Sequence, residues 1–293
     1  MTDITLLDGG LGQELVHRTP HAPTSLWSTQ VMIDHPGLVE AVHRDFFDAG
    51  ATIATANTYT VHADRLIDTR FADQQEPLIA AALNAALSAR HAPNHRVAGS
   101  IGPLIGSFRP DTHPDLPTAV PLYADLAKRL APSVDLIICE TVASLMHAEA
   151  VLAGARQTNL PVWLSVTLDD EDGRKLRSGE QVSTLAHLMP DAWLANCSVP
   201  EAMSAGLDVL ATFGKPYGAY ANGFTEITKD FLKAKATVDA LSARKDITPE
   251  TYADTVLQWV DQGATIVGGC CEIGPNHIRE IARRLNAAGH AIV

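Results

Sequence analysis

Two adjacent cysteines, Cys270 and Cys271, lie in the segment ATIVGGCCEIG, where a run of apolar residues ends in two glycines. The chain has four cysteines, and another of them, Cys197, follows an apolar run in AWLANCS. Cysteine thiolates hold zinc at about 2.3 Å in a tetrahedral arrangement. Three protein ligands leave one position open, which is typical of a catalytic rather than a structural zinc. The three cysteines therefore predict a Zn²⁺ site that can accept one further ligand.

The cysteines are also compatible with roles that involve no metal. A free cysteine often serves as a small apolar residue that fills space in a core. We interpret Cys139, which lies inside a predicted strand, in this way, and the same role would suit Cys197 taken alone. A strained vicinal disulfide is the corresponding alternative for Cys270 and Cys271, although disulfides are rare in the cytoplasm.

The glycines Gly268 and Gly269 suggest how one ion could bind both neighbouring sulfurs. Successive residues of a regular strand point to opposite faces, so Cys270 and Cys271 would diverge. A kink is needed to bring them together, and we expect the two glycines to provide it with φ angles that other residues avoid.

The thiolate ligands also indicate the kind of chemistry. Three of them leave a zinc centre with a net negative charge, which makes it a poor Lewis acid for splitting water. Such a centre still binds a fourth thiol and holds it as a nucleophilic thiolate at neutral pH, which predicts alkyl transfer to a thiol substrate. A non-catalytic zinc- or thiol-binding protein is one alternative. A zinc hydrolase, which would call for His or carboxylate ligands, is the least favoured.

The elements that must position these residues alternate regularly along the chain. Short runs of β-branched and apolar residues are each followed by a segment of helical length. The runs are nearly continuous in apolar character, as expected of parallel strands covered on both faces. The predicted strands lie within 4–10, 51–59, 96–102, 136–141, 162–168, 192–198, 217–223 and 264–270.

Eight strand–helix units in 293 residues are typical of an α/β protein of the (β/α)8 TIM-barrel type, which we expect to form a single domain over residues 1–293. A doubly wound open sheet is the alternative, but no GxGxxG segment follows a predicted strand. Residues 109–117 and 223–246 are longer insertions that we expect over one mouth of the barrel. The predicted helices lie within 36–50, 76–91, 144–158, 198–214, 248–263 and 274–289.

Active sites of TIM barrels lie at the carboxyl ends of the strands. Polar or sulfur-bearing residues at the predicted strand ends are therefore the candidates for the site, and the three cysteines are among them. The candidates are Asp8, Asn57, Ser100, Glu140, Thr141, Thr167, Asn196, Cys197, Asn222, Cys270 and Cys271.

A thiol substrate that is also an amino acid needs partners for its ammonium and carboxylate groups. Asp8 or Glu140 could pair with the ammonium. The backbone amides around Gly9, Gly10 and Leu11 could bind the carboxylate, because DGGLGQEL is typical of a strand that turns into a helix. The alternative roles are a helix cap or turn residue for Asp8 and an arginine partner for Glu140.

The composition narrows the partners and the location. The net charge of −12 argues against nucleic acid or an anionic membrane as the main partner. No stretch approaches the roughly 20 apolar residues of a membrane span. The N-terminus lacks the basic and apolar regions of a secretory signal, so we expect a cytoplasmic protein. We expect small-molecule substrates and a monomer or weak homo-oligomer.

The motifs DGGLGQEL, ANTY, ICET, NCS and GGCC, in this order, resemble those of the homocysteine S-methyltransferases. The resemblance extends from about Leu6 to Arg284 and implies a (β/α)8 barrel. It also implies that the zinc is held by Cys197, Cys270 and Cys271. The thiolate of homocysteine would take the open position on the zinc and attack a methyl group to give methionine.

The resemblance further implies the residues that bind the substrates. The family's aspartate of DGG and glutamate of ET contact homocysteine, which assigns the same role to Asp8 and Glu140. Asn57 and Asn222 complete the expected substrate contacts. The family carries PN after the seventh strand, and this chain departs from it with Ala221 before Asn222.

The methyl donor is expected to be an onium compound. A positively charged methyl group suits a site lined with aromatic rings, for which Trp27 and Tyr59 are the candidates, with Trp27 favoured by the resemblance. The betaine enzymes have a tyrosine where this chain has His62, and a long C-terminal arm that does not follow Val293. We therefore expect S-methylmethionine or S-adenosylmethionine. A betaine- or other onium-dependent methyltransferase acting on a thiol or selenol is the alternative.

Overall fold

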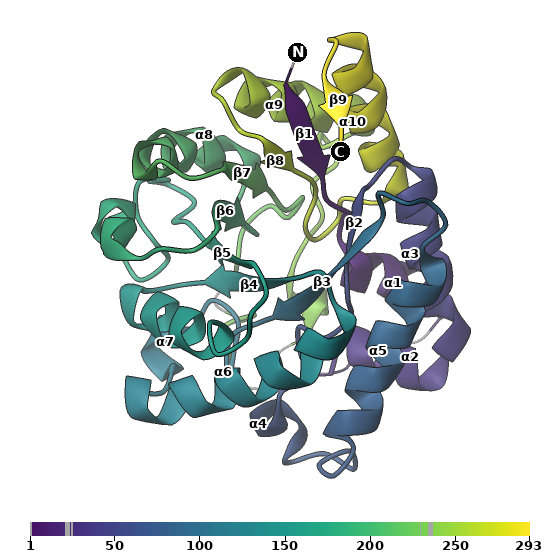
Figure 1. Cartoon of the computed structure of the whole chain (residues 1–293), viewed down its shortest axis with the longest axis vertical. Coiled ribbons are helices and arrows are strands. Elements are labelled where there is room, and N and C mark those ends of the chain that lie inside the picture. The colour runs from purple at the N-terminus through teal and green to yellow at the C-terminus, as the bar shows by residue number, and fades with distance from the viewer. Residues whose placement is uncertain (1, 21–23, 25, 229, 234–236) are drawn as a thin grey trace.

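The computed structural model describes residues 2–20, 24, 26–228, 230–233 and 237–293. Within these ranges, parallel strands form one sheet in the order β2-β3-β4-β5-β6-β7-β8-β1-β9, and the sheet curls into a barrel with helices around the outside (Figure 1). The strands are β1 (Asp3–Leu6), β2 (Ile53–Thr55), β3 (Arg96–Ile101), β4 (Leu136–Val142), β5 (Val162–Val166), β6 (Ala192–Asn196), β7 (Tyr217–Tyr220), β8 (Ile266–Val267) and β9 (Ala291–Ile292).

Strand β1 closes the barrel. On one side it pairs with β8, where Thr5 lies opposite Ile266. On the other side Leu7, which follows β1, forms a bridge with Ile53, and the amide of Asp8 donates to the carbonyl of Ile53 at 3.0 Å. Strands β1 to β8 thus form the predicted (β/α)8 barrel. The short β9 pairs with Asp3 and Ile4 of β1, so the first and last strands of the chain lie side by side (Figure 1).

The six helices predicted from apolar periodicity all form, but α2, α4 and α6 lie outside the predicted ranges. Helix α6 lies outside the predicted helices because prolines, including Pro121 within it, obscure the pattern. After β5 the chain forms a 3-10 helix, Val182–His187, in place of an α-helix, since the residues before it are used in two antiparallel bridges. The α-helices are α1 (Leu11–His17), α2 (Ser28–Asp34), α3 (Pro36–Asp48), α4 (Ala63–Leu66), α5 (Gln75–Ala89), α6 (Leu116–Leu130), α7 (Leu145–Ala155), α8 (Pro200–Leu210), α9 (Pro249–Asp261) and α10 (Pro275–Ala287).

The core has two layers, one inside the barrel and one between the sheet and the helices. In β4, Leu136 and Ile138 belong to the inner layer, whereas Ile137 and Cys139 belong to the outer layer. Cys139 is fully buried and free, so it packs against the helices as predicted. The alternation of β4 turns the next side chain, Glu140, towards the barrel interior.

The insertion within 223–246 lies over the mouth at the carboxyl ends of the strands, as expected. Phe224, Phe231 and Leu241 from this segment line the cavity there. Arg109 from the other predicted insertion donates to the carbonyl of Leu232 and joins the two loops.

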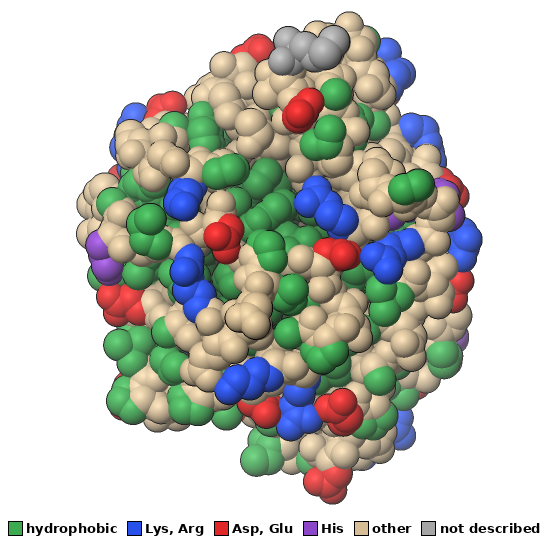
Figure 2. Space-filling model, in the orientation of Figure 1, with side chains coloured by type: hydrophobic (Ala, Val, Ile, Leu, Met, Phe, Trp, Pro, Cys, Tyr) green, Lys and Arg blue, Asp and Glu red, His purple; other side chains and the backbone are tan. Residues whose placement is uncertain are grey.

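Two surface properties bear on the expected partners. On the face seen in Figure 2, acidic and basic side chains are interspersed around a green apolar centre. Among the helices that the structure describes, none has the length and apolar character needed to cross a bilayer.

Candidate metal centre and active site

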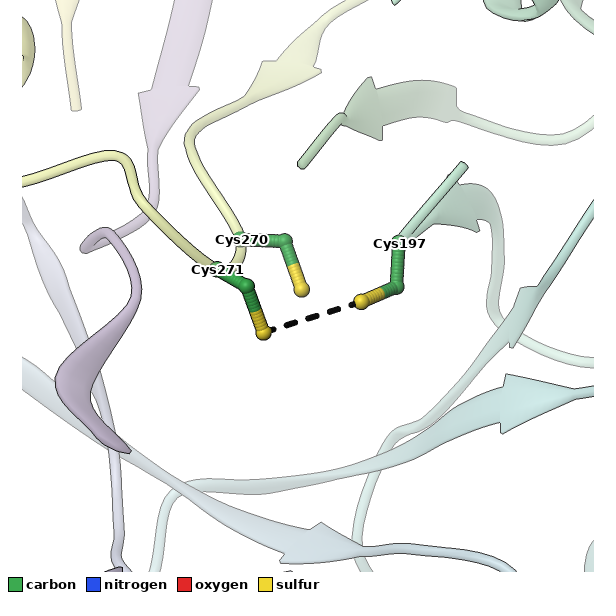
Figure 3. A group of neighbouring side chains, drawn as sticks. All are labelled: Cys197, Cys270 and Cys271. Carbon is green, nitrogen blue, oxygen red and sulfur yellow. Dashed lines mark hydrogen bonds between the residues drawn. The ribbon is translucent and has the colours of Figure 1, made fainter. Parts of the chain in front are cut away.

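The three predicted metal ligands lie together at the carboxyl ends of the strands (Figure 3). Cys197 follows β6, and Cys270 and Cys271 follow β8. Their sulfur atoms all lie within 4.8 Å of one another, and those of Cys197 and Cys271 are 3.9 Å apart. Two sulfurs bound to one tetrahedral zinc would lie about 3.8 Å apart. The cluster therefore fits a single metal ion with little movement.

The backbone that brings the sulfurs together differs from the expected kink. Neither Gly268 nor Gly269 has a positive φ angle, whereas Cys197 itself (+55°) and Glu272, which follows Cys271 (+67°), do. Strand β8 ends before the glycines, so no strand alternation remains to be broken. The glycines are needed for close packing instead, since a Cβ atom on Gly269 would lie 2.2 Å from Cγ2 of Ile273.

The three thiols of the cluster differ in their pKa. Hydrogen bonds from Cys270 and Cys271 hold the pKa of the Cys197 thiol well below its usual value. The hydrogen bond with Cys197 is the largest cause that raises the pKa values of the Cys270 and Cys271 thiols well above the ordinary value, and burial raises them further. By themselves the thiols therefore favour a Cys197 thiolate held by two neutral thiols, whereas a metal ion would ionise all three.

Asp8 lies buried at the end of β1 and lines the cavity. Its two carboxyl oxygens accept hydrogen bonds from the amide of Thr55 at 2.7 Å and from the hydroxyl of Thr55 at 2.8 Å. Burial raises the pKa of Asp8 from 3.8 to about 8, and the neighbouring Glu140 adds to the rise. Asp8 does not cap α1, whose N-cap is Gly10, so the helix-cap alternative is excluded.

Glu140 is also buried and faces the same cavity. Its Oε1 accepts a hydrogen bond from the Tyr220 hydroxyl at 2.8 Å, and its Oε2 accepts one from the hydroxyl of Ser100. Burial raises the pKa of Glu140 from 4.5 to about 7. Within the described ranges, no Lys or Arg side chain forms an ion pair with Glu140 or Asp8, so the arginine-partner alternative is not realised. Two buried carboxyl groups without a cation are suited to an ammonium ligand.

The cavity is lined by the predicted site residues with two exceptions, Thr167 and Asn222. Thr167 is buried, and its hydroxyl lies 3.2 Å from that of Ser198. Asn222 is buried beside Cys197, and its hydrogen bond with that thiol helps to lower the pKa of Cys197.

The backbone amides predicted to bind a carboxylate are engaged within the protein. The amide of Gly10 donates to the carbonyl of Ile273, and that of Leu11 donates to the carbonyl of Gly9, both at 2.8 Å. These two amides therefore hold the turn after β1 in place.

Trp27 and Tyr59 form an aromatic wall of the cavity, with their rings edge to face and 6.2 Å between the ring centres. Trp27 Nε1 donates to Gln13 at 2.8 Å, and Gln13 in turn donates to Glu272 at 2.5 Å. A Cβ atom on Gly12 would lie 2.3 Å from the Trp27 ring, so only glycine fits there. The aromatic wall is thus tied to the turn that follows the cysteine pair.

Some residues of the site have roles that the sequence did not predict. Asn57, a predicted contact, accepts a hydrogen bond from the hydroxyl of Ser28 at 2.7 Å and so fixes the start of α2. Tyr220 was missed, although the alternation of β7 places it on the inner face and could have identified it. Thr55 and Arg65 were also missed, since neither hydrogen bonding across strands nor loop packing leaves a local pattern.

The fold and the site define a (β/α)8 barrel with a three-cysteine candidate metal site beside two buried carboxyl groups. The model of the homocysteine S-methyltransferase family matches residues 5–285. Homocysteine S-methyltransferase of Escherichia coli (strain K12) is 30% identical over 313 residues, which cover 96% of this chain and 95% of that protein. Homocysteine S-methyltransferase 4 of Zea mays is 26% identical over 320 residues, with 97% and 90% covered.

A solved structure supports the same relationship. The homocysteine methyltransferase MmuM from Escherichia coli, in its metallated form, matches with a TM-score of 0.78 and 27% identity over 97% of this chain and 96% of that chain. The chain belongs to the homocysteine S-methyltransferase family.

Proposed function

We propose that this chain transfers a methyl group from a sulfonium donor to homocysteine and so forms methionine. The observation that carries the proposal is the convergence of three sulfurs, within 4.8 Å of one another, at a cavity that also holds two buried carboxyl groups. A protein that only stored metal would have no use for carboxyl groups placed to hold an ammonium.

The donor set fits zinc. MmuM has been solved in a metallated form, and we extend metal binding to this chain with Cys197, Cys270 and Cys271 as ligands. Thiolates select soft or borderline metals, and three of them with one open position suit catalytic zinc. When bound, the zinc would ionise the thiol of homocysteine and keep it nucleophilic.

The protein side chains would orient the amino-acid part of homocysteine. Its ammonium would lie between Asp8 and Glu140, where it supplies the cation that both carboxyl groups lack. Their ionised forms are favoured once the ammonium binds, because an opposite charge at short range outweighs part of the cost of burial. The thiol would then reach the cysteine cluster.

The transfer itself exchanges two carbon–sulfur bonds. The sulfur of homocysteine forms a bond with the methyl carbon as the bond from that carbon to the sulfonium breaks. The electron pair stays on the donor sulfur, which becomes a neutral thioether. Trp27 and Tyr59 would stabilise the positive charge of the donor through their ring faces.

A sulfonium donor is favoured over betaine by the place of His62. This residue stands where the betaine enzymes are expected to have a donor-binding tyrosine. Here it is buried with its ring edge to face against Tyr123, 6.1 Å between centres, and it is not among the described residues that line the cavity.

The test combines metal analysis with a product assay. The wild-type chain should bind about one zinc ion and form methionine from homocysteine and S-methylmethionine, as detected by mass spectrometry. The substitution Cys271→Ala should abolish stoichiometric zinc binding and lower the rate by at least about 100-fold.

Cys139→Ala provides the matched control, since Cys139 is a buried cysteine outside the cluster. It should keep both the zinc and the activity within about twofold. Zinc-loaded wild-type protein that forms no methionine from any onium donor would overturn the proposed function.

A further inference from the structure

Arg65 on α4 is the only Lys, Arg or His among the described residues that line the cavity. Its Nε and Nη2 donate to the carbonyl of Pro103 at 3.2 and 2.8 Å, and its Nη2 lies 3.5 Å from the hydroxyl of Ser107. In the part of the chain that the structure describes, no carboxylate forms an ion pair with Arg65. A half-buried guanidinium held only by neutral oxygens keeps its full charge for an anionic ligand.

Arg65 belongs to the aromatic side of the cavity. Its Cζ lies 5.8 Å from the centre of the Tyr59 ring, and the Tyr59 hydroxyl is 2.8 Å from that of Ser107. Asp8 and Glu140 form their side-chain hydrogen bonds elsewhere, with Thr55, Ser100 and Tyr220. The cavity therefore has an acidic end for an ammonium and a basic end beside the aromatic wall.

We propose that Arg65, with the hydroxyls of Tyr59 and Ser107, binds the carboxylate of the methyl donor. The donor is then an amino-acid sulfonium with a free carboxylate, not a simple onium compound. This inference rests on the proposed function and specifies its donor. It also explains how a cavity that attracts a sulfonium tolerates an arginine, because the carboxylate of the donor lies between the two positive charges.

The two amino-acid substrates are then sorted by charge. Homocysteine presents its ammonium to Asp8 and Glu140, and the donor presents its carboxylate to Arg65. Arginine suits this role because its planar fork offers two parallel donors to a carboxylate. The atoms Nε and Nη2 are held by Pro103, which orients the remaining donors.

The experiment compares S-methyl-L-methionine with its carboxamide, which has the same size but no negative charge. With homocysteine fixed, wild-type enzyme should use the carboxylate donor at least about tenfold better in kcat/KM, the effect of a charged hydrogen bond. In Arg65→Gln this preference should fall to within about threefold, while the KM for homocysteine and the zinc content stay unchanged. Arg65→Lys should recover part of the preference.

Arg70→Gln is the matched control, because Arg70 is an exposed arginine five positions further along and does not line the cavity. It should keep the wild-type preference. If Arg65→Gln lowers kcat/KM equally for both donors, or raises only the KM for homocysteine, the inference is overturned. The methyltransferase function then stays in place.

Calorimetry without homocysteine tests the donor site independently of methyl transfer. Zinc-loaded wild-type protein should bind S-methyl-L-methionine more tightly than the carboxamide, and Arg65→Gln should not distinguish them. If this preference is found but no methionine forms, the donor site stands and the proposed function fails. If wild-type protein binds the two compounds equally, the donor site fails.

Discussion

In the proposed function, the charges of Asp8 and Glu140 decide whether the site can hold an ammonium. Burial raises their pKa values to about 8 and about 7, so each is neutral at lower pH and ionised at higher pH. Neutral carboxyl groups make only weak partners for a cation. The affinity for an amino-acid substrate should therefore depend on pH close to neutrality.

The first prediction concerns this dependence in catalysis. The kcat/KM for homocysteine should rise with pH through the range of about 7 to 8, as the two carboxyl groups ionise. Glu140→Gln should raise the KM for homocysteine by roughly 10- to 100-fold at pH 8, because a charged hydrogen bond is lost. Glu171→Gln, at an exposed turn, should change nothing. Steady-state kinetics across pH measures both, and an unchanged KM in Glu140→Gln would contradict the assigned role.

The second prediction concerns stability without substrate. The folded pKa of Asp8 lies above its ordinary value of 3.8, so folding favours the protonated form. This contribution is fully present below about pH 4 and is lost as the pH rises to about 8. Urea unfolding should show that the free energy of unfolding falls less from pH 5 to pH 8 in Asp8→Asn than in the wild type. Equal losses in both would show that Asp8 does not carry the effect.

The elements around the site depend on the close approach of the turn after β1 to the turn after β8. A Cβ atom on Gly9 would lie 2.0 Å from the carbonyl oxygen of Ile273, and one on Gly10 would lie 2.4 Å from that of Cys270. The amide of Gly10 also donates to Ile273. The start of α1 is thus packed directly against the backbone of the cysteine pair.

Gly10→Ala tests this packing. The added methyl group meets backbone that cannot rotate away, so we expect a loss of about 1–3 kcal/mol in the free energy of unfolding and weaker zinc binding. Gly37→Ala is the matched control, since nothing lies within 4 Å of a Cβ atom there and the position is in α3. It should be neutral or stabilise by up to about 1 kcal/mol. Zinc titration and urea unfolding decide, and equal behaviour of the two variants would refute the packing argument.

For the whole molecule, the cysteine cluster joins parts of the barrel that are not hydrogen-bonded neighbours. Strands β6 and β8 are separated by β7 in the sheet, and Cys197 and Cys271 follow the two outer strands of this group. A metal ion that binds only the folded chain stabilises it in proportion to the logarithm of its concentration.

Metal removal should therefore destabilise the barrel. A free zinc concentration of 100 times the Kd corresponds to about 2.7 kcal/mol, so chelation should lower the Tm by several degrees. Cys197→Ala should show the same Tm with zinc and with chelator, as measured by calorimetry. A wild-type Tm that does not change on chelation would argue against a metal bridge between these strands.

The barrel and the place of the cysteines at its mouth were predictable because their signals are local. Apolar runs mark the strands, helical periodicity marks most helices, and functional residues gather where parallel strands end. The alternation of β4 even separates Cys139, in the outer layer, from Glu140, which faces the interior. Helix α6 and the 3-10 helix after β5 were missed because prolines and turn residues hide the period.

The partners of these residues were decided only by the tertiary structure. The sequence indicates that Cys197 and Cys271 share one mouth, but barrel closure and loop packing set their sulfurs 3.9 Å apart. The hydrogen bond from Tyr220 to Glu140 joins two distant segments, and no local sequence pattern predicts it. The same holds for the contact of the Arg65 guanidinium with the Tyr59 ring. Such contacts depend on the register of the strands and the shape of the loops, which are properties of the whole fold and not of any local stretch.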